Sequence, residues 1–184
     1  MKRVSCLVAS VFATVSLSPG CVDQDGGAEG TSTPLREDAA QRAVEAVHEI
    51  RRLTLAEDWM AIFDRMPADL FPGGEAALRR AKEAAPRDLA GWKKSGVLEL
   101  SENMQPELPE SIHAIAGRHV CVVRYRSRVK GRDFKGCQIA IRTDGGASWE
   151  ILSGSEAAVS YLRDAHRVIY QSIKDDVQPV ELVN

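Results

Sequence analysis

The pattern of apolar and polar residues divides the chain after residue 35 into a helical part and a later, strand-rich part. Between residues 36 and 66, apolar residues recur at helical spacing in two successive stripes. They are Val44, Val47, Ile50 and Leu53 in the first stripe, and Trp59, Ile62, Phe63 and Met66 in the second. Between the stripes, Thr54-Leu55-Ala56-Glu57 has the capping-box pattern that starts a helix. The pattern therefore predicts two helices, followed by a short helix over residues 75–84 that ends before Pro86.

From Gly96 onward, apolar and polar residues alternate with the period of two that is typical of strands. The alternation predicts strands over residues 97–104, 117–127, 134–142 and 148–152. The clearest turn is Asp144-Gly145-Gly146, which suits a three-residue hairpin loop. Such a loop would place four apolar residues on one face of the sheet, in two cross-strand pairs. These pairs are Ile141 with Trp149 and Ile139 with Ile151.

The chain after the strands has the pattern of a further helix. Ser155 is a suitable N-cap residue, and a buried stripe follows it at Val159, Leu162, Ile169 and Ile173. Residues 177–184 are predicted to form a tail. Helices, then a four-stranded antiparallel meander, then a C-terminal helix make an α+β fold. We expect one such domain over residues 36–176.

The N-terminal residues have the features of an export signal. Lys2 and Arg3 precede an apolar stretch over residues 4–17, which is too short to span a membrane as a mature helix. Leu17-Ser18-Pro19-Gly20-Cys21 then resembles the lipobox of bacterial lipoproteins, with Leu17 one residue further from the cysteine than is usual. The resemblance implies that residues 1–20 are a cleaved signal peptide and that Cys21 carries fatty acyl chains such as palmitate. Ordinary secretion and a buried N-terminal helix are the alternatives.

Residues 21–35 read as the lipidated cysteine and a flexible tether, because the segment is rich in Gly, Asp, Ser and Thr. A tether of about 14 residues would hold a domain on the order of 20 Å from the membrane. The anchor at Cys21 therefore predicts an exported lipoprotein of the bacterial cell envelope, facing the periplasm or the cell surface. The membrane is the one partner that the sequence predicts, and any protein partner is unknown.

Composition excludes several classes of protein. The chain has 26 acidic and 24 basic residues, and the 44% of hydrophobic residues is enough for a packed core. Lys2 and Arg3 lie in the predicted signal, so the chain after Cys21 has 22 basic and 26 acidic residues. This balance argues against a polybasic nucleic-acid-binding protein, and we expect no nucleic-acid partner.

The order of elements and the run from Ile139 to Trp149 resemble small exported members of the nuclear-transport-factor-2-like superfamily. This is the cone-shaped fold of ketosteroid isomerase and polyketide cyclases, and the resemblance covers about residues 38–153. It implies a pocket inside the cone, with an acid or a histidine as the catalytic group. The predicted pocket lining includes Tyr125, Ile139, Ile141, Trp149 and Ile151, none of which is an acid or a histidine. No catalytic residue and no cofactor can therefore be carried over.

Two cysteines are candidates for a disulfide. If the hairpin that joins their strands turns near Val129, Cys121 lies opposite Cys137 on the inward face. Facing cysteines in an oxidising compartment usually form a disulfide, and buried thiols are the alternative. A zinc site formed by these cysteines and His119 is a weaker alternative, because no Cys-x-x-Cys pair supports it. We predict no bound metal.

The remaining candidates are histidines and a basic segment. His48 and His166 lie beside apolar stripes of predicted helices and are expected to be boundary residues, and no Gly-x-Ser-x-Gly motif supports a Ser-His-Asp triad. The basic segment alternates on one strand face and continues into a turn. It consists of Arg124, Arg126, Arg128, Lys130, Arg132 and Lys135. The segment is either a solvated face or a contact for an anionic lipid or envelope polymer.

Taken with the lipobox, these patterns predict a lipid-anchored, non-enzymatic domain of the cell envelope that binds or scaffolds an unknown ligand. The alternative is a small-molecule isomerase or dehydratase with its active site in the cone pocket. An enclosed cavity that holds a buried acid or histidine would favour the enzyme, and a filled apolar core would favour the binding domain.

Overall fold

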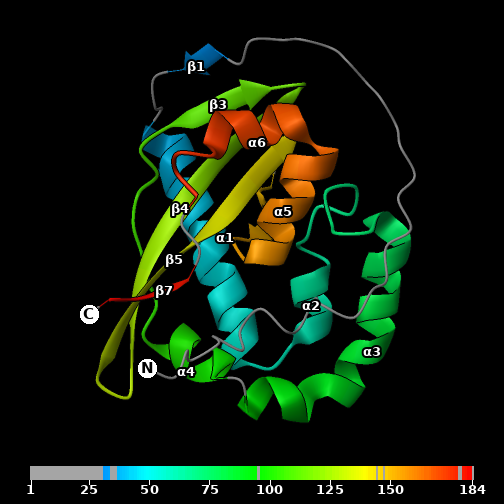
Figure 1. Cartoon of the computed structure of the whole chain (residues 1–184), viewed down its shortest axis with the longest axis vertical. Coiled ribbons are helices and arrows are strands. Elements are labelled where there is room, and N and C mark those ends of the chain that lie inside the picture. Colours follow the sequence, from blue (N-terminus) through cyan, green and yellow to red (C-terminus); the bar gives the residue numbers. More distant parts are fainter. Residues whose placement is uncertain are drawn as a thin grey trace.

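A long antiparallel hairpin forms the centre of the fold (Figure 1). The computed structural model describes residues 31–33, 37–94, 96–143, 145–146, 148–177 and 180–183. Strands β4 (Arg118–Val129) and β5 (Arg132–Thr143) each have 12 residues and pair along their whole length. Their central parts are rich in valine and isoleucine, whose β-branched side chains pack well on a pleated surface.

Shorter strands flank different halves of this hairpin, and all pairings are antiparallel. In one half, β3 (Ile112–Ile115) pairs with β4, and β6 (Glu150–Ser153) pairs with β5. In the other half, β2 (Gln105–Pro106) pairs with β4, and β7 (Glu181–Val183) pairs with β5. Strand β1 (Thr31–Thr33) pairs with the outer edge of β3. The path β3-β4-β5-β6 is an antiparallel meander. The predicted tether and the predicted tail each contain a strand of this sheet, β1 and β7 respectively.

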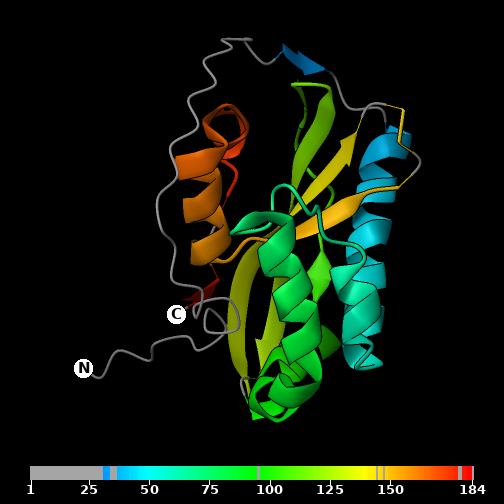
Figure 2. The same cartoon turned by 90° about the vertical axis from the view of Figure 1, so that its right-hand side faces the viewer.

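Helices cover both faces of the sheet, so the fold has three layers (Figure 2). Helix α1 (Glu37–Leu55) packs on one face. Helices α5 (Glu156–Ala165) and α6 (Arg167–Ile173) pack on the other. Helices α2 (Trp59–Phe63) and α3 (Gly74–Lys94) pack against each other in a small cluster of their own, around Phe63, Phe71 and Leu78.

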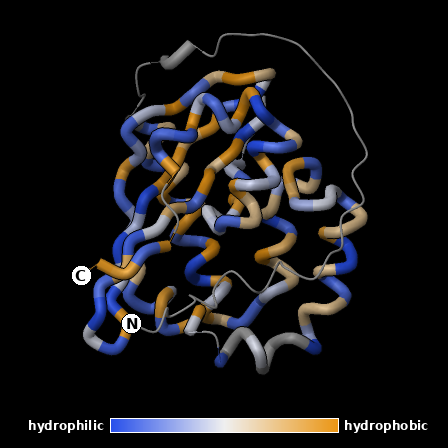
Figure 3. Tube along the Cα trace, in the orientation of Figure 1, coloured by the Kyte–Doolittle hydropathy of each residue, from blue (hydrophilic) through white to orange (hydrophobic). Residues whose placement is uncertain are grey.

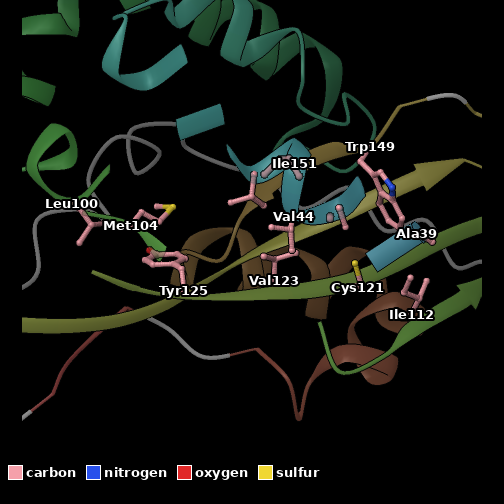
Figure 4. Close-up of a cluster of buried hydrophobic side chains, with 13 residues drawn as sticks. Ala39, Val44, Leu100, Met104, Ile112, Cys121, Val123, Tyr125, Trp149 and Ile151 are labelled. Atoms are coloured by element: carbon pink, nitrogen blue, oxygen red, sulfur yellow. The ribbon is translucent and has the colours of Figure 1, made fainter. Parts of the chain in front are cut away.

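Each face of the sheet has its own buried apolar cluster, and the centres of β4 and β5 are hydrophobic along the trace (Figure 3). The cluster under α1, drawn in Figure 4, includes Val44, Val47, Cys121, Val123, Tyr125, Ala140, Trp149 and Ile151. The cluster under α5 and α6 includes Val120, Val122, Cys137, Ile139, Ile141, Leu152, Leu162, Ile169 and Ile173. Successive residues of both strands are therefore buried on alternate sides.

The helical stripes at Val44, Val47 and Leu53 are buried as predicted, but several element boundaries differ. Residues 97–104 were expected to form a strand, and the structure has helix α4 (Val97–Glu102) there, which starts after Gly96 at φ 80°. The short helix predicted at 75–84 is the first part of α3, which continues through Pro86 and changes direction along its length in Figure 1.

Two predicted helix starts have different outcomes. Thr54 does not cap a helix, because its hydroxyl donates to the carbonyl of Ile50 within α1. Helix α2 starts later, and the Asp58 side chain accepts from the amide of Ala61 at 3.2 Å. Ser155 caps α5 as predicted. The predicted last helix, however, is two helices that are separated at His166.

In the described part of the chain, no helix is both long enough and apolar enough to cross a membrane. The predicted signal peptide and Cys21 lie outside the described residues.

Candidate functional site

The predicted disulfide between Cys121 and Cys137 is wrong. In the register of the β4–β5 hairpin, Cys121 faces Ala140 and Cys137 faces Arg124. The two sulfur atoms therefore lie on opposite faces of the sheet, in different apolar clusters, and both residues are buried thiols. Burial raises the pKa of the Cys121 thiol to about 12, which keeps it protonated and unreactive. The zinc alternative fails for the same reason, because Cys121 and Cys137 cannot meet at one metal ion.

The turn of this hairpin explains the error. Val129 pairs with Arg132, so the loop has only two residues, Lys130 and Gly131. Both have positive φ, 50° and 77°, as a type I′ turn requires. The predicted pairing, which placed the turn at Val129, differs from the observed pairing by an odd number of residues. A shift of this kind moves every side chain to the other face of the sheet.

The predicted pocket lining is divided between the two faces of the sheet. Tyr125, Trp149 and Ile151 lie under α1, whereas Ile139 and Ile141 lie under α5 and α6. The cause is again the register, because Ile141 pairs with Glu150 instead of Trp149. All five side chains are packed in filled apolar clusters. They line no common pocket.

The basic segment is balanced by acids. Arg124, Arg126 and Arg128 share a strand face, as predicted. Their ion pairs are Arg124 with Asp176 at 3.1 Å and with Glu110, Arg126 with Glu107 at 2.9 Å, Arg128 with Asp133 at 2.7 Å, and Lys130 with Glu99 at 3.4 Å. Arg132 is exposed in the same turn region. The surface is therefore a mixed one with closely paired charges, and it is not a uniformly positive patch.

The predicted histidines have different environments. His48 is exposed on α1. His119 lies on the Cys121 side of β4, because it is two residues before that cysteine. His166 is half-buried between α5 and α6, and it belongs to a group of titratable residues that sequence patterns did not bring together.

This group, which we call the Asp69 cluster, consists of Asp69, Arg118, Glu150, Tyr161 and His166. Asp69 lies in the loop between α2 and α3, and its neighbour Leu70 is fully buried in the α5–α6 face. Both Asp69 carboxylate oxygens accept from the Arg118 guanidinium, one of them at 3.4 Å. The amide of Ile151 donates to the carbonyl of Arg65 at 2.7 Å, which holds the loop against β6.

The His166 ring belongs to the Asp69 cluster. It packs on Tyr161 with 5.4 Å between ring centroids, and the negative charge of Asp69 acts on it. Within the described part of the chain, the buried Nε2 of this ring has no hydrogen-bond partner. Burial lowers the pKa of His166 below 6.5, and the ring is therefore mostly neutral at pH 7.

The two carboxyl groups of the Asp69 cluster have opposite shifts. Burial, reinforced by the negative charge of Asp69, raises the pKa of Glu150. Burial also opposes ionisation of Asp69, but the hydrogen bond and the charge of Arg118 outweigh it and hold the pKa of Asp69 below its usual value. Titratable groups whose environments separate their pKa values in this way are typical of functional sites, although structural ion pairs produce the same signature.

An apolar depression is built by three of the parts of the chain that form the Asp69 cluster, namely the loop before α3, strand β6 and helix α5. Its cavity volume is only about 10 Å³, and its lining is Met66, Phe71, Pro72, Leu152, Ser153 and Ala158. This is smaller than the roughly 300–1,000 Å³ that is usual for small-molecule pockets. The depression is therefore shallow, with room for about one water molecule.

A stability measurement tests the environment of His166. Its lowered pKa means that the unfolded state binds the proton more tightly, so this residue makes stability increase as pH rises and level off above 6.5. The free energy of unfolding of the wild type, compared with that of His166→Gln, should therefore increase between pH 5 and pH 8. The increase should be less than about 1 kcal/mol, because solvent screens a half-buried group. Urea denaturation across this range measures the difference. A difference that does not change with pH would contradict the assignment.

A second polar group contains a serine, a histidine and an aspartate, but it lacks the geometry of a catalytic triad. Ser111 Oγ lies 2.8 Å from His113 Nε2, and Asp176 Oδ2 lies 3.7 Å from the same nitrogen. In a triad the carboxylate holds the other ring nitrogen. Arg124 donates to Asp176 Oδ1 at 3.1 Å and to its carbonyl at 3.3 Å. The group therefore fastens the end of α6 to strands β3 and β4.

Sequence analysis missed the Asp69 cluster because its members come from four separate elements. Comparison of the chain with family models, with curated proteins and with solved structures found no match.

Proposed function

We propose that this protein is a lipid-anchored, non-enzymatic domain of the bacterial cell envelope, and that it binds or scaffolds a partner through the Asp69 cluster and the adjacent apolar depression. The observation that carries the proposal is the filling of both sheet faces. The residues expected to line a catalytic pocket are packed against helices α1, α5 and α6. The perturbed charges lie instead at the surface, where the Asp69 side chain is 58% exposed.

The anchor in this proposal is Cys21. Strand β1 starts at Thr31 and pairs with β3, so nine residues lie between the acylated cysteine and the folded sheet. An extended chain of that length spans at most about 35 Å. The β1–β3 end of the domain would therefore stay close to the membrane surface.

The same geometry weakens the proposed contact of the basic segment with anionic lipid. Strand β1 pairs with β3 beside residues 119–120 of β4, whereas the β4–β5 turn lies at Lys130 and Gly131. Ten residues of strand correspond to about 33 Å. The turn lies at the opposite end of the sheet from β1 (Figure 1), and its cations are paired. An envelope polymer remains the more suitable anionic partner for it.

The resemblance to the nuclear-transport-factor-2-like superfamily is part of the proposal at the level of the fold. Helices followed by an antiparallel meander support it. The layer of α5 and α6 over the second face goes beyond the core of that fold.

A small-molecule isomerase or dehydratase is the second candidate, and the Asp69 cluster supplies the specific observation in its favour. A carboxyl with a raised pKa, Glu150, and a neutral imidazole, His166, are the groups that proton transfer near pH 7 requires. In this alternative the active site is the Asp69 cluster at the surface, and the cone interior takes no part.

Site-specific cross-linking separates the two candidates. A photo-reactive phenylalanine analogue at Tyr161, introduced into the full-length protein in its native membrane, should form a defined protein adduct. Asp69→Asn and Arg118→Gln should reduce its yield severalfold, because each removes one half of a charge-assisted contact that orients the cluster.

The matched control carries the same analogue at Arg52, which is exposed on α1 in the opposite layer. It should give no such adduct. Equal adducts from both positions, or an adduct that is insensitive to Asp69→Asn, would refute the proposed binding surface. A small molecule that co-purifies with the protein and is lost in Glu150→Gln would favour the enzyme instead.

A further inference from the structure

Arg142, which is half-buried, and Trp149, which is buried, form a separate pair on the α1 face of the sheet. Arg142 is at the end of β5, and Trp149 immediately precedes β6. The guanidinium carbon of Arg142 lies 5.1 Å from the centroid of the indole ring, which is the distance of a cation–π contact. Trp149 is only 4% exposed. The pair lies across the sheet from the Asp69 cluster, since Glu150 has the opposite parity to Trp149.

Both residues have a buried N–H group that finds no acceptor. Within the described part of the chain, neither Trp149 Nε1 nor Arg142 Nε has a hydrogen-bond partner. Leaving a buried donor unpaired costs about 1–3 kcal/mol, and more when the group is charged. Two such donors on one stacked pair of side chains are therefore an uncommon feature that calls for a physical explanation.

The chemistry of the two donors restricts what can satisfy them. An indole N–H and a guanidinium N–H can only donate, and the guanidinium is always positively charged. The complementary group is an anion with two acceptor oxygens, such as a carboxylate or a phosphate. The positive charge of Arg142 acts in this region, because it opposes the rise in the pKa of the Cys121 thiol on the neighbouring strand.

Helix α1 contributes a further favourable field. It has 19 residues and begins at Glu37, and Ala39 in its first turn belongs to the same buried cluster as Trp149. Figure 4 shows the indole of Trp149 beside Ala39, with Cys121 on the strand nearby. The N-terminal end of a helix stabilises a bound anion through its free amides and its dipole.

We propose that Arg142 and Trp149, at the start of helix α1, form a binding site for a carboxylate or phosphate group of a small ligand. The guanidinium and the indole N–H each donate to one oxygen, and the helix terminus adds to the attraction. This site is independent of the Asp69 cluster and of the lipid anchor, so it can be tested separately from the proposed function.

The indole N–H resonance of Trp149 provides a direct measurement in the full-length protein, held in detergent. Phosphate and acetate are titrated in separate arms, which distinguish the two kinds of oxyanion. At least one of them should shift this resonance saturably, with an apparent dissociation constant on the order of millimolar. Trp149→Phe identifies the resonance among those of the three tryptophans.

Arg142→Gln should weaken this saturable shift about tenfold or more, because it removes the charge-assisted donor. Arg126→Gln is the matched control, since Arg126 is exposed, 69% at its side chain, and pairs with Glu107 at a distance from Trp149. It should leave the titration unchanged, and the other resonances of both variants report whether each is folded. A resonance that moves with neither anion, moves equally with chloride at the same ionic strength, or responds unchanged in Arg142→Gln would overturn the proposal.

Discussion

Cys21→Ala should move the protein from the membrane fraction to the soluble fraction, or leave it as an uncut precursor. The expected effect is close to complete, because the anchor depends on one residue. Each methylene group of an acyl chain that enters the bilayer contributes about 0.8 kcal/mol, so several chains on one cysteine hold the protein durably. Cell fractionation, with mass spectrometry of the mature N-terminus, measures both outcomes.

Cys6→Ala is the matched control for this experiment. Cys6 lies in the apolar stretch of the predicted signal peptide, and its substitution should change neither cleavage nor fractionation. A wild-type mature protein that is soluble and carries no acyl chain would show that the lipobox assignment is wrong.

Gly154→Ala should destabilise the domain by about 1–3 kcal/mol or more. Gly154 is buried at the end of β6, and its amide donates to the carbonyl of Cys137 at 3.2 Å. A Cβ atom at this position would collide with that carbonyl oxygen and with the Cys137 sulfur. The oxygen belongs to the backbone of β5, so relief requires movement of a central strand.

Gly91→Ala provides the contrast in the same protein. Gly91 lies in helix α3, and an added Cβ would meet nothing within 4 Å. Because alanine has the higher helix propensity, this change should be neutral or stabilise by up to about 1 kcal/mol. Urea denaturation of both variants measures the difference. A Gly154→Ala protein as stable as wild type would contradict the described packing of β6 on β5.

Local sequence signals predicted the elements that depend on neighbouring residues. The apolar stripe of α1 is buried, Ser155 caps α5, and the three strands from residue 117 to 152 lie close to their predicted positions. The exception at residues 97–104 has a local reason as well. Val97, Leu98 and Leu100 suit either a strand or one turn and a half of helix, and periodicity alone cannot separate them in so short a segment.

The face of each strand residue could not be read in the same way. Alternation of apolar and polar residues identifies the inner face of a strand when the other face is exposed to solvent. Here, however, Val120 to Val123 and Ile139 to Ile141 are buried on both faces of the sheet. These continuous apolar runs could have indicated a doubly covered sheet. The glycine in each two-residue turn, Gly117 and Gly131, could have indicated the register.

Local patterns were enough to predict the α+β order of elements and the buried faces of the helices, because these follow from spacing within a few residues. The packing of the layers set the faces of the two cysteines, and it brought together Asp69, Arg118, Glu150, Tyr161 and His166. It also decided the contact of Arg142 with Trp149. Register and cross-layer contacts depend on the lengths of turns and on which helices cover which face. A shift of one residue in a turn reverses every side chain of a strand, so these contacts are settled only when the layers pack together.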